Sequence, residues 1–237
     1  MAKLPEKERF ELLEELEKRY SEPRSSFLLK RKKYAWLLVV KGAYFLKRLI
    51  DIAVSLMMIV LLSPILLIIA FIVKLDGGPA FYVAKRVGRY GQEFDFPKFR
   101  TMRKDADKYK SNLMQEKDPK LFKMRDDPRI TKFGKILRKT SLDELPQLWT
   151  TLKGDMSLVG PRPPLPQEVA LYSIEERRKL DITPGITGLW QVSGRSDIPF
   201  HEQMRLDLAY IESQSLWLDF VILLKTIPAV IFGKGAY

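Results

Sequence analysis

Two adjacent carboxylates, Asp143 and Glu144, lie in a segment that also holds Arg138 and Arg162. In such a pair one carboxylate can attack a phosphorus atom while the other holds a divalent metal. Guanidinium groups beside them can neutralise phosphate oxygens through paired, charge-assisted hydrogen bonds. These residue types therefore predict a site that handles phosphate and a metal ion.

A structural role for the same residues is the alternative. Ser141-x-x-Glu144 is a capping-box pattern, and acidic residues stabilise a helix N-terminus. Pro146 complicates the cap, because proline inside a helix loses a hydrogen bond and clashes with the previous turn. Either the helix kinks there or it begins near Leu145. Both roles stay open, since free N–H groups at a helix N-terminus would also stabilise a phosphoryl group.

The composition narrows the classes of protein. A length of 237 residues with 46% hydrophobic residues suits one domain with appendages. The absence of cysteine excludes disulfides and thiolate zinc sites, and the single histidine, His201, excludes a multi-histidine metal centre. A net charge of +12 favours a polyanionic partner, either nucleic acid or an anionic membrane face.

An uncharged run from Ile52 to Val73 provides the lipid-facing element. At the rise of a helix it covers about 33 Å, enough for a bilayer core. Ser63 and Pro64 lie at its middle, where proline bends a helix, and basic residues flank both ends. These observations fit a re-entrant helix that returns to the same face. A kinked spanning helix fits the same physics.

The other segments form smaller elements around this helix. Residues 1–21 show the spacing of an amphipathic helix, which makes a homodimer worth testing. Alternating aromatic and polar residues around Gly88 and Gly91 predict a hairpin. The charge-dense residues 103–127 predict a solvated helix, and residues 130–152 predict two helices that meet near 140–143.

Two further segments complete the pattern. A glycine-punctuated loop at residues 184–195 carries Gln191 and Arg195, which suit a nucleotide or phosphate as well as a plain surface role. Residues 216–232 are apolar but interrupted by charges and a proline, which favours a surface-lying or core helix over a span.

From Lys47 to Tyr237 the chain resembles the bacterial sugar transferases, the monotopic polyprenyl-phosphate phosphoglycosyl transferases. The ordered matches are Lys47-Arg48-x-x-Asp51, Ser63-Pro64, Arg86-Val-Gly88, FPKFRTM at 96–102, the segment 138–163, PGITGLWQVSGR at 184–195, Leu206-Asp207-x-x-Tyr210, Leu218-Asp219 and Lys225-Thr226. Thr150-Thr151 departs from the family pattern. The resemblance implies transfer of a sugar 1-phosphate from a UDP-sugar to polyprenyl (undecaprenyl) phosphate, with release of UMP, which starts a lipid-linked glycan or exopolysaccharide.

The resemblance also implies an architecture. We expect a predominantly helical α+β fold, in which a re-entrant broken helix and interfacial amphipathic helices surround a small cytosolic catalytic domain. The expected parts are an N-terminal extension at 1–44, a re-entrant membrane helix at 45–75 and a transferase domain at 76–237. The resemblance places the protein at the cytoplasmic face of the bacterial inner membrane.

Roles for single residues follow from the same resemblance. Asp143 would be the nucleophile that carries the phosphosugar, and Glu144, with Asp143, would bind Mg²⁺. Arg138 and Arg162 would hold phosphate oxygens with help from Lys98 or Arg100, and Gln191 and Arg195 would contact the donor. The ending Gly235-Ala-Tyr resembles relatives that use UDP-glucose or UDP-galactose.

Two rival functions account for part of the pattern. A non-enzymatic membrane scaffold that binds lipid or nucleic acid explains the charge and the apolar run but leaves the carboxylate pair unexplained. A hydrolase of UDP-sugars would use the same carboxylates and metal. With the family resemblance we expect a phospholipid membrane, and no nucleic acid, as the macromolecular partner.

Overall fold

The computed structural model describes residues 23–106 and 127–233, together with Gly235 and, nearer the start of the chain, Glu11, Glu14, Glu15 and Lys18. The chain divides into two compact units, Met1–Lys47 and Arg48–Tyr237. Most of the predicted N-terminal amphipathic helix and of the predicted solvated helix at 103–127 lies outside the described residues. The second unit contains every predicted site residue.

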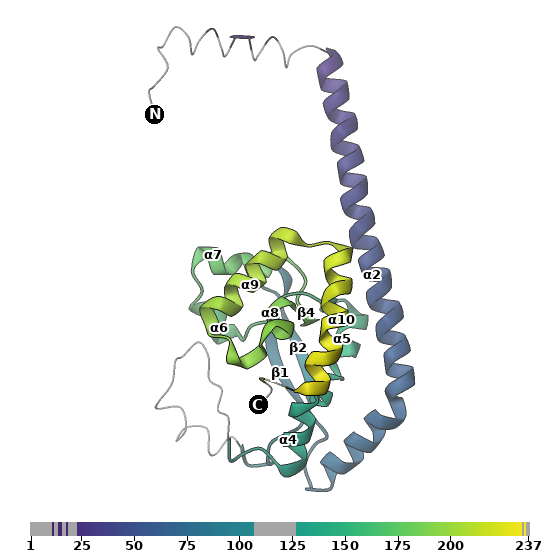
Figure 1. Ribbon diagram of the computed structural model, residues 1–237, viewed down its shortest axis with the longest axis vertical. Helices are drawn as coiled ribbons and strands as arrows, with labels where there is room; N and C mark the ends of the chain where they lie inside the picture. Colours follow the sequence, from purple (N-terminus) through teal and green to yellow (C-terminus); the bar gives the residue numbers. More distant parts are fainter. Residues whose placement is uncertain are drawn as a thin grey trace. The chain divides into compact units, whose positions relative to one another are not determined.

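The long apolar helix predicted from the sequence is confirmed as part of α2, Pro23–Lys74. Its last turns leave the line of the turns before them (Figure 1). Pro64 lies inside the helix and cannot donate to the carbonyl of Val60. The Ser63 hydroxyl donates to that same carbonyl at 2.8 Å, so the bend leaves no orphaned acceptor there. The re-entrant path stays a prediction.

The predicted hairpin is confirmed. Strand β1, Phe81–Val87, pairs antiparallel with β2, Glu93–Phe99, across a short turn at η1, Arg89–Gly91. The register sets Arg86 opposite Phe94 and Tyr82 opposite Lys98. This hairpin holds Lys98, which is half-buried and lies 45 residues before Asp143 in the sequence.

The two predicted helices after residue 130 are also confirmed. Helix α4 spans Lys132–Lys139, and α5 spans Gln147–Lys153, with Pro146 as its N-cap residue. Between them the 3-10 turn η4, Leu142–Glu144, carries both carboxylates. The capping-box interpretation is wrong, because the Ser141 side chain makes no cap hydrogen bond to this turn and the residue adopts a left-handed backbone with φ 55°. The α-helix thus begins after Leu145.

A small parallel sheet was not predicted. Strand β3, Ser157–Val159, pairs with β4, Gly185–Thr187. Strand β4 lies within the segment interpreted as a glycine-punctuated loop. That loop interpretation is partly wrong, since α8, Leu189–Ser193, follows β4 directly. The remaining elements are α6 Pro166–Ala170, α7 Ile174–Arg177, η5 Arg178–Asp181, η6 Arg195–Asp197, α9 Phe200–Ser213 and α10 Leu216–Phe232.

Two apolar clusters hold the site in place. One packs Leu148 of α5 and Val159 of β3 against Ile222 of α10, with side chains of α2 around them. The other packs Ile69 of α2 against Phe99 of β2 and Leu137 of α4. Burial of such side chains contributes about 1.5–3 kcal/mol each. Because the clusters adjoin β2, α4 and α5, they fix the elements on either side of η4.

Helix α10 has two different faces. Ile222 and Asp219 are buried, and the Asp219 carboxylate accepts a hydrogen bond from the Tyr210 hydroxyl at 2.6 Å. The opposite side exposes large apolar residues at spacings of three and four, namely Trp217, Phe220, Leu224, Ile227 and Ile231. The prediction of a surface-lying or core helix fits both faces.

Candidate active site

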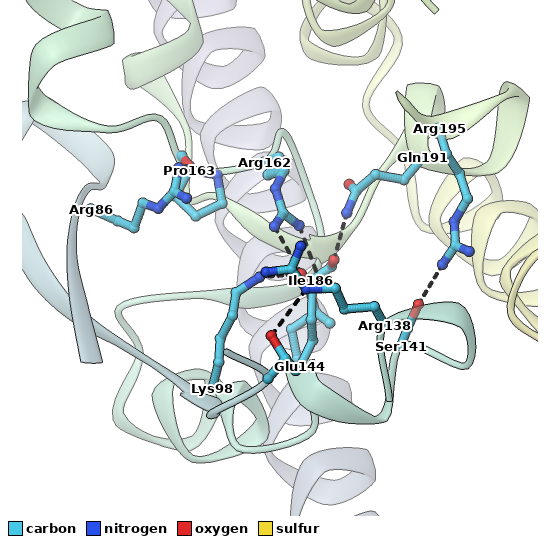
Figure 2. A network of polar contacts seen from close by, with 11 residues as sticks. Arg86, Lys98, Arg138, Ser141, Glu144, Arg162, Pro163, Ile186, Gln191 and Arg195 are labelled. Carbon is cyan, nitrogen blue, oxygen red and sulfur yellow. Dashed lines mark hydrogen bonds and ion pairs between the residues drawn. The ribbon is translucent and has the colours of Figure 1, made fainter. Parts of the chain in front are cut away.

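Glu144 is the centre of a half-buried ion-pair cluster. Its carboxylate accepts from Lys98 Nζ at 2.5 Å and from both terminal nitrogens of Arg162 at 2.8 and 3.2 Å (Figure 2). Although burial alone would raise the pKa of Glu144, Arg162 and Lys98 hold it well below its ordinary value. Glu144 is therefore ionised, and it neutralises part of the charge of two cations.

Asp143 is in a different state although it is the adjacent residue. It is only 7% exposed, and it accepts no hydrogen bond from any residue that the structure describes. Burial raises the pKa of Asp143 to about 6. The positive charge of Lys98 lowers this pKa, and the negative charge of Glu144 raises it further. An unpartnered carboxylate among cations is suited to meet an electrophile bound there.

Phe96 of β2 is a platform for the basic side chains. The Arg86 guanidinium carbon and Lys98 Nζ each lie 5.3 Å from its ring centroid. The Arg162 guanidinium carbon lies 5.9 Å from the same centroid. The negative face of an aromatic ring attracts cations at such distances. Phe96 thus helps to keep mutually repelling cations together, alongside the attraction of Glu144 and Glu168.

Arg86 is a residue to which sequence reasoning gave no role. Its Nη1 donates to the carbonyl of Pro163 at 3.1 Å, and its Nε is buried without a hydrogen-bond partner in the part of the chain that the structure describes. Burial, with repulsion from Arg162, lowers the pKa of Arg86 to about 10. The motif Arg86-Val-Gly88 was the available signal, but only the three-dimensional structure brings Arg86 beside the Phe96 ring.

The other predicted residues have diverse partners. Arg138 donates from Nε to the Thr101 hydroxyl at 3.0 Å, and its charge opposes the rise in the pKa of Asp143. Gln191 donates to the carbonyl of Ile186 at 2.8 Å, and Arg195 donates to the Ser141 hydroxyl (Figure 2). Arg100 donates to the carbonyl of Val73 and pairs with Asp76.

All of these predicted site residues line one open cavity of about 1320 Å³. Its only acidic residues in the described part of the chain are Asp143 and Glu144, whereas basic residues are numerous. The wall continues into apolar side chains of α2, α5 and α10, including Met58, Leu62, Leu148, Leu223 and Ile227. The cavity can therefore hold a phosphate-bearing group next to a hydrocarbon chain.

The carboxylate pair is compatible with Mg²⁺. Asp143 and Glu144 are the acidic residues that line the cavity, and within the described residues no three His, Cys, Asp or Glu side chains come together. Mg²⁺ is commonly held by one or two carboxylates with substrate phosphates and water. Among the described residues, Glu144 Oε2 accepts from Arg162 alone, which leaves it a lone pair for a metal.

Sequence comparison identifies relatives of this chain. It is 46% identical over 193 residues to "Galactosyl transferase CpsE" of Streptococcus agalactiae, a match that covers 80% of this chain and 43% of the relative. It is 44% identical over 207 residues to "Undecaprenyl-phosphate galactose phosphotransferase" of Salmonella typhimurium, with 84% and 43% covered. With "Exopolysaccharide production protein ExoY" of Sinorhizobium fredii the identity is 43% over 198 residues, with 81% and 88% covered.

The chain thus spans about two-fifths of the length of the first two relatives and most of the third. Residues 42–233 match the family described as "Bacterial sugar transferase". That range includes η4, the hairpin, the Phe96 platform and the apolar wall of the cavity. The chain therefore belongs to the bacterial sugar transferase family.

Proposed function

We propose that this protein transfers a hexose 1-phosphate from a UDP-hexose to undecaprenyl phosphate and releases UMP. The observation that carries the proposal is the unpartnered Asp143 carboxylate, next to Glu144 and Lys98 in a cavity that has an apolar wall. The two relatives named for galactose transfer favour UDP-galactose as the donor, with UDP-glucose as the alternative. Such a product would initiate a lipid-linked glycan or exopolysaccharide.

The first step would use Asp143 as the nucleophile. An Asp143 oxygen attacks the sugar-bearing phosphorus, the bond from that phosphorus to the bridging oxygen breaks, and UMP leaves with both bonding electrons. Lys98 and Arg162 can stabilise the charge on the phosphate oxygens, because Glu144 balances only part of their own charge. The result would be an acyl phosphate on Asp143.

The second step would regenerate the carboxylate. A phosphate oxygen of the polyprenyl phosphate attacks the phosphorus of the acyl phosphate, and the bond from phosphorus to Asp143 breaks. Arg86 and Arg138 are further cations in the cavity that can bind the acceptor's phosphate. Mg²⁺, held by Asp143 and Glu144, would offset the negative charge of the diphosphate.

The exposed apolar surfaces support a position at the membrane surface. The most apolar part of α2 has a mean hydropathy of 3.1 and is only 11% buried, and α10 exposes an apolar stripe. We propose that α2 is re-entrant and that the cavity lies at the cytoplasmic face, where it meets a lipid acceptor. Basic residues on both sides of the apolar run agree with this arrangement.

An activity assay tests the transfer. Purified protein in lipid discs receives Mg²⁺ and UDP-galactose or UDP-glucose, with or without undecaprenyl phosphate, and UMP is measured. We expect multiple turnovers only with the lipid, and at most one equivalent of UMP without it. Asp143→Asn should release none, whereas Asp95→Asn, at an exposed pair with Lys85, is the matched control and should match the wild type.

Each rival predicts a different result. A hydrolase would release many equivalents of UMP without lipid, and a scaffold would release none with it. For the covalent step, donor labelled with ³²P at the sugar-bearing phosphate should label the wild-type protein but not Asp143→Asn. Equal UMP release by Asp143→Asn would refute the nucleophile assignment.

The absence of native cysteine makes the topology directly testable. Single cysteines at Lys3 and at Ser111 should both resist a membrane-impermeant thiol reagent in intact cells. Both should react once the membrane is opened. Labelling of the Lys3→Cys protein alone in intact cells would mean that α2 spans the membrane.

A further inference from the structure

Two residues at the cavity have an unfavourable backbone and hold each other. Ser141 and Arg195 both adopt left-handed conformations, with φ 55° and 57°. For a residue other than glycine such a conformation is unfavourable, so surrounding contacts must stabilise it. The Arg195 Nη2 donates to the Ser141 hydroxyl at 2.5 Å, which joins the two strained positions directly (Figure 2).

The segment after α10 contacts both sides of this hydrogen bond. At Gly233, φ is 61°, and an added Cβ would lie 2.9 Å from the Lys139 carbonyl oxygen, two residues before Ser141. At Gly235, φ is 69°, and an added Cβ would lie 2.5 Å from the Gly194 carbonyl oxygen and 3.1 Å from Arg195 Cβ. Only glycine allows so close an approach at these two positions.

A backbone hydrogen bond fixes the second contact. The amide of Ser196 donates to the carbonyl of Gly235 at 3.2 Å, next to the strained Arg195. Arg195 Nη1 is buried and has no hydrogen-bond partner among the described residues. A buried N–H group of this kind is costly unless an acceptor completes it, and phosphate oxygens are strong acceptors.

From these contacts we propose that the segment at Gly233 and Gly235 positions Arg195 for the donor's diphosphate. The segment packs on Lys139 on one side and on Gly194 to Asp197 on the other, so it sets the distance between Ser141 and Arg195. Since Ser141 leads directly into the turn that carries Asp143, the same contacts set the place of the guanidinium relative to the nucleophile. This inference rests on the proposed function, because it assigns Gly235 as a positioning residue for that donor.

The test compares Gly235→Ala with Gly91→Ala. Gly91 has a similar φ of 77° but nothing within 4 Å of an added Cβ, so it reproduces the backbone strain without the contact. We expect Gly235→Ala to lower kcat/KM for the UDP-hexose at least about tenfold and to leave kcat/KM for undecaprenyl phosphate unchanged. Gly91→Ala should stay within about twofold of the wild type for both substrates.

A double-mutant cycle shows whether the effect passes through Arg195. In an Arg195→Ala background, Gly235→Ala should change donor kcat/KM by less than about twofold, because the positioned group is gone. Ser141→Ala, which removes the hydroxyl without crowding, should reproduce the Gly235→Ala loss and provides the second variant if Gly235→Ala does not fold. Additive losses in the cycle, or wild-type donor kinetics in Ser141→Ala, would overturn the proposal.

UDP binding separates this proposal from the proposed function. If the wild type releases no UMP from either UDP-hexose, the proposed function fails, and the same cycle is then measured by calorimetric titration with UDP. Weaker UDP binding in Gly235→Ala that disappears in the Arg195→Ala background would support the positioning role. Unchanged UDP affinity in Gly235→Ala would refute it.

Discussion

The cavity at Asp143 and the junction between α2 and β3 both bury an aspartate, but they treat it differently. At the junction, Asp51 accepts from the Leu158 amide at 2.9 Å and from the Ser157 hydroxyl at 3.1 Å. In the cavity, Asp143 has cations nearby and no hydrogen bond from the described residues. A buried carboxylate that accepts hydrogen bonds, as Asp51 does on Oδ1, stabilises the fold, whereas one that accepts none is available for a reaction.

The largest effect on transfer should come from Asp143→Asn. The amide cannot act as the nucleophile, so we expect the rate to fall by at least about a thousandfold. The same change should raise stability by roughly 2–3 kcal/mol at pH 7.5, because a pKa raised to about 6 means that the folded state disfavours the ionised group. Thermal unfolding in detergent measures this.

The pH dependence of the stability gain in Asp143→Asn provides a control for its cause. The penalty for ionised Asp143 is present above its folded pKa and fades as the pH falls toward the unfolded pKa, where both states are protonated. The difference in Tm between Asp143→Asn and the wild type should therefore shrink between pH 7.5 and pH 5. A lower Tm for Asp143→Asn at pH 7.5 would contradict the proposed environment.

Glu144→Gln should have the next largest effect and should change stability in the opposite direction. Removing the charge leaves the half-buried Lys98 and Arg162 with a weaker partner, which costs about 1–3 kcal/mol. Transfer should fall about a hundredfold, since these cations and any Mg²⁺ lose their anchor. Unfolding and UMP assays on Glu144→Gln and Asp143→Asn together test whether neighbouring carboxylates have opposite roles.

The acid limb of the first half-reaction should follow Asp143. Attack requires the ionised carboxylate. The rate of the UMP burst at low UDP-hexose should therefore fall about tenfold per pH unit below about pH 6 and level off above pH 7. The burst is measured without undecaprenyl phosphate, because a monophosphate also titrates near pH 6. A rate that rises as the pH falls below 6 would exclude this assignment.

The sequence predicts the elements that have local signals but not the contacts between distant residues. The apolar run in α2, the hairpin and the helices around η4 have local signals, namely hydropathy, alternation and helical spacing. The environment of Glu144 has none, because Lys98 and Arg162 reach it from 46 and 18 residues away. Local reasoning therefore offered a capping box, whereas the Glu144 side chain pairs with distant cations.

The sequence also did not predict the short strands or the role of Phe96, for related reasons. Strands β3 and β4 are three residues each, too short for a period to be recognised, and they pair across a long connection. In the sequence, Phe96 looks like an ordinary core residue. Its contacts with cations become visible only in the folded structure, where Arg162 lies over its ring. Matches to the family motifs located the carboxylates but could not give their protonation states.

The smallest effect on transfer is expected at the junction. Asp51→Ala removes both acceptor bonds and leaves the Leu158 amide buried without a partner, which costs about 1–3 kcal/mol. The rate per folded molecule should stay within about threefold of the wild type, since Asp51 does not line the cavity. Asp51→Asn keeps one acceptor oxygen and should recover part of the loss in Tm. A hundredfold drop in the rate of folded Asp51→Ala would mean that the junction controls the chemistry, and the comparison would fail.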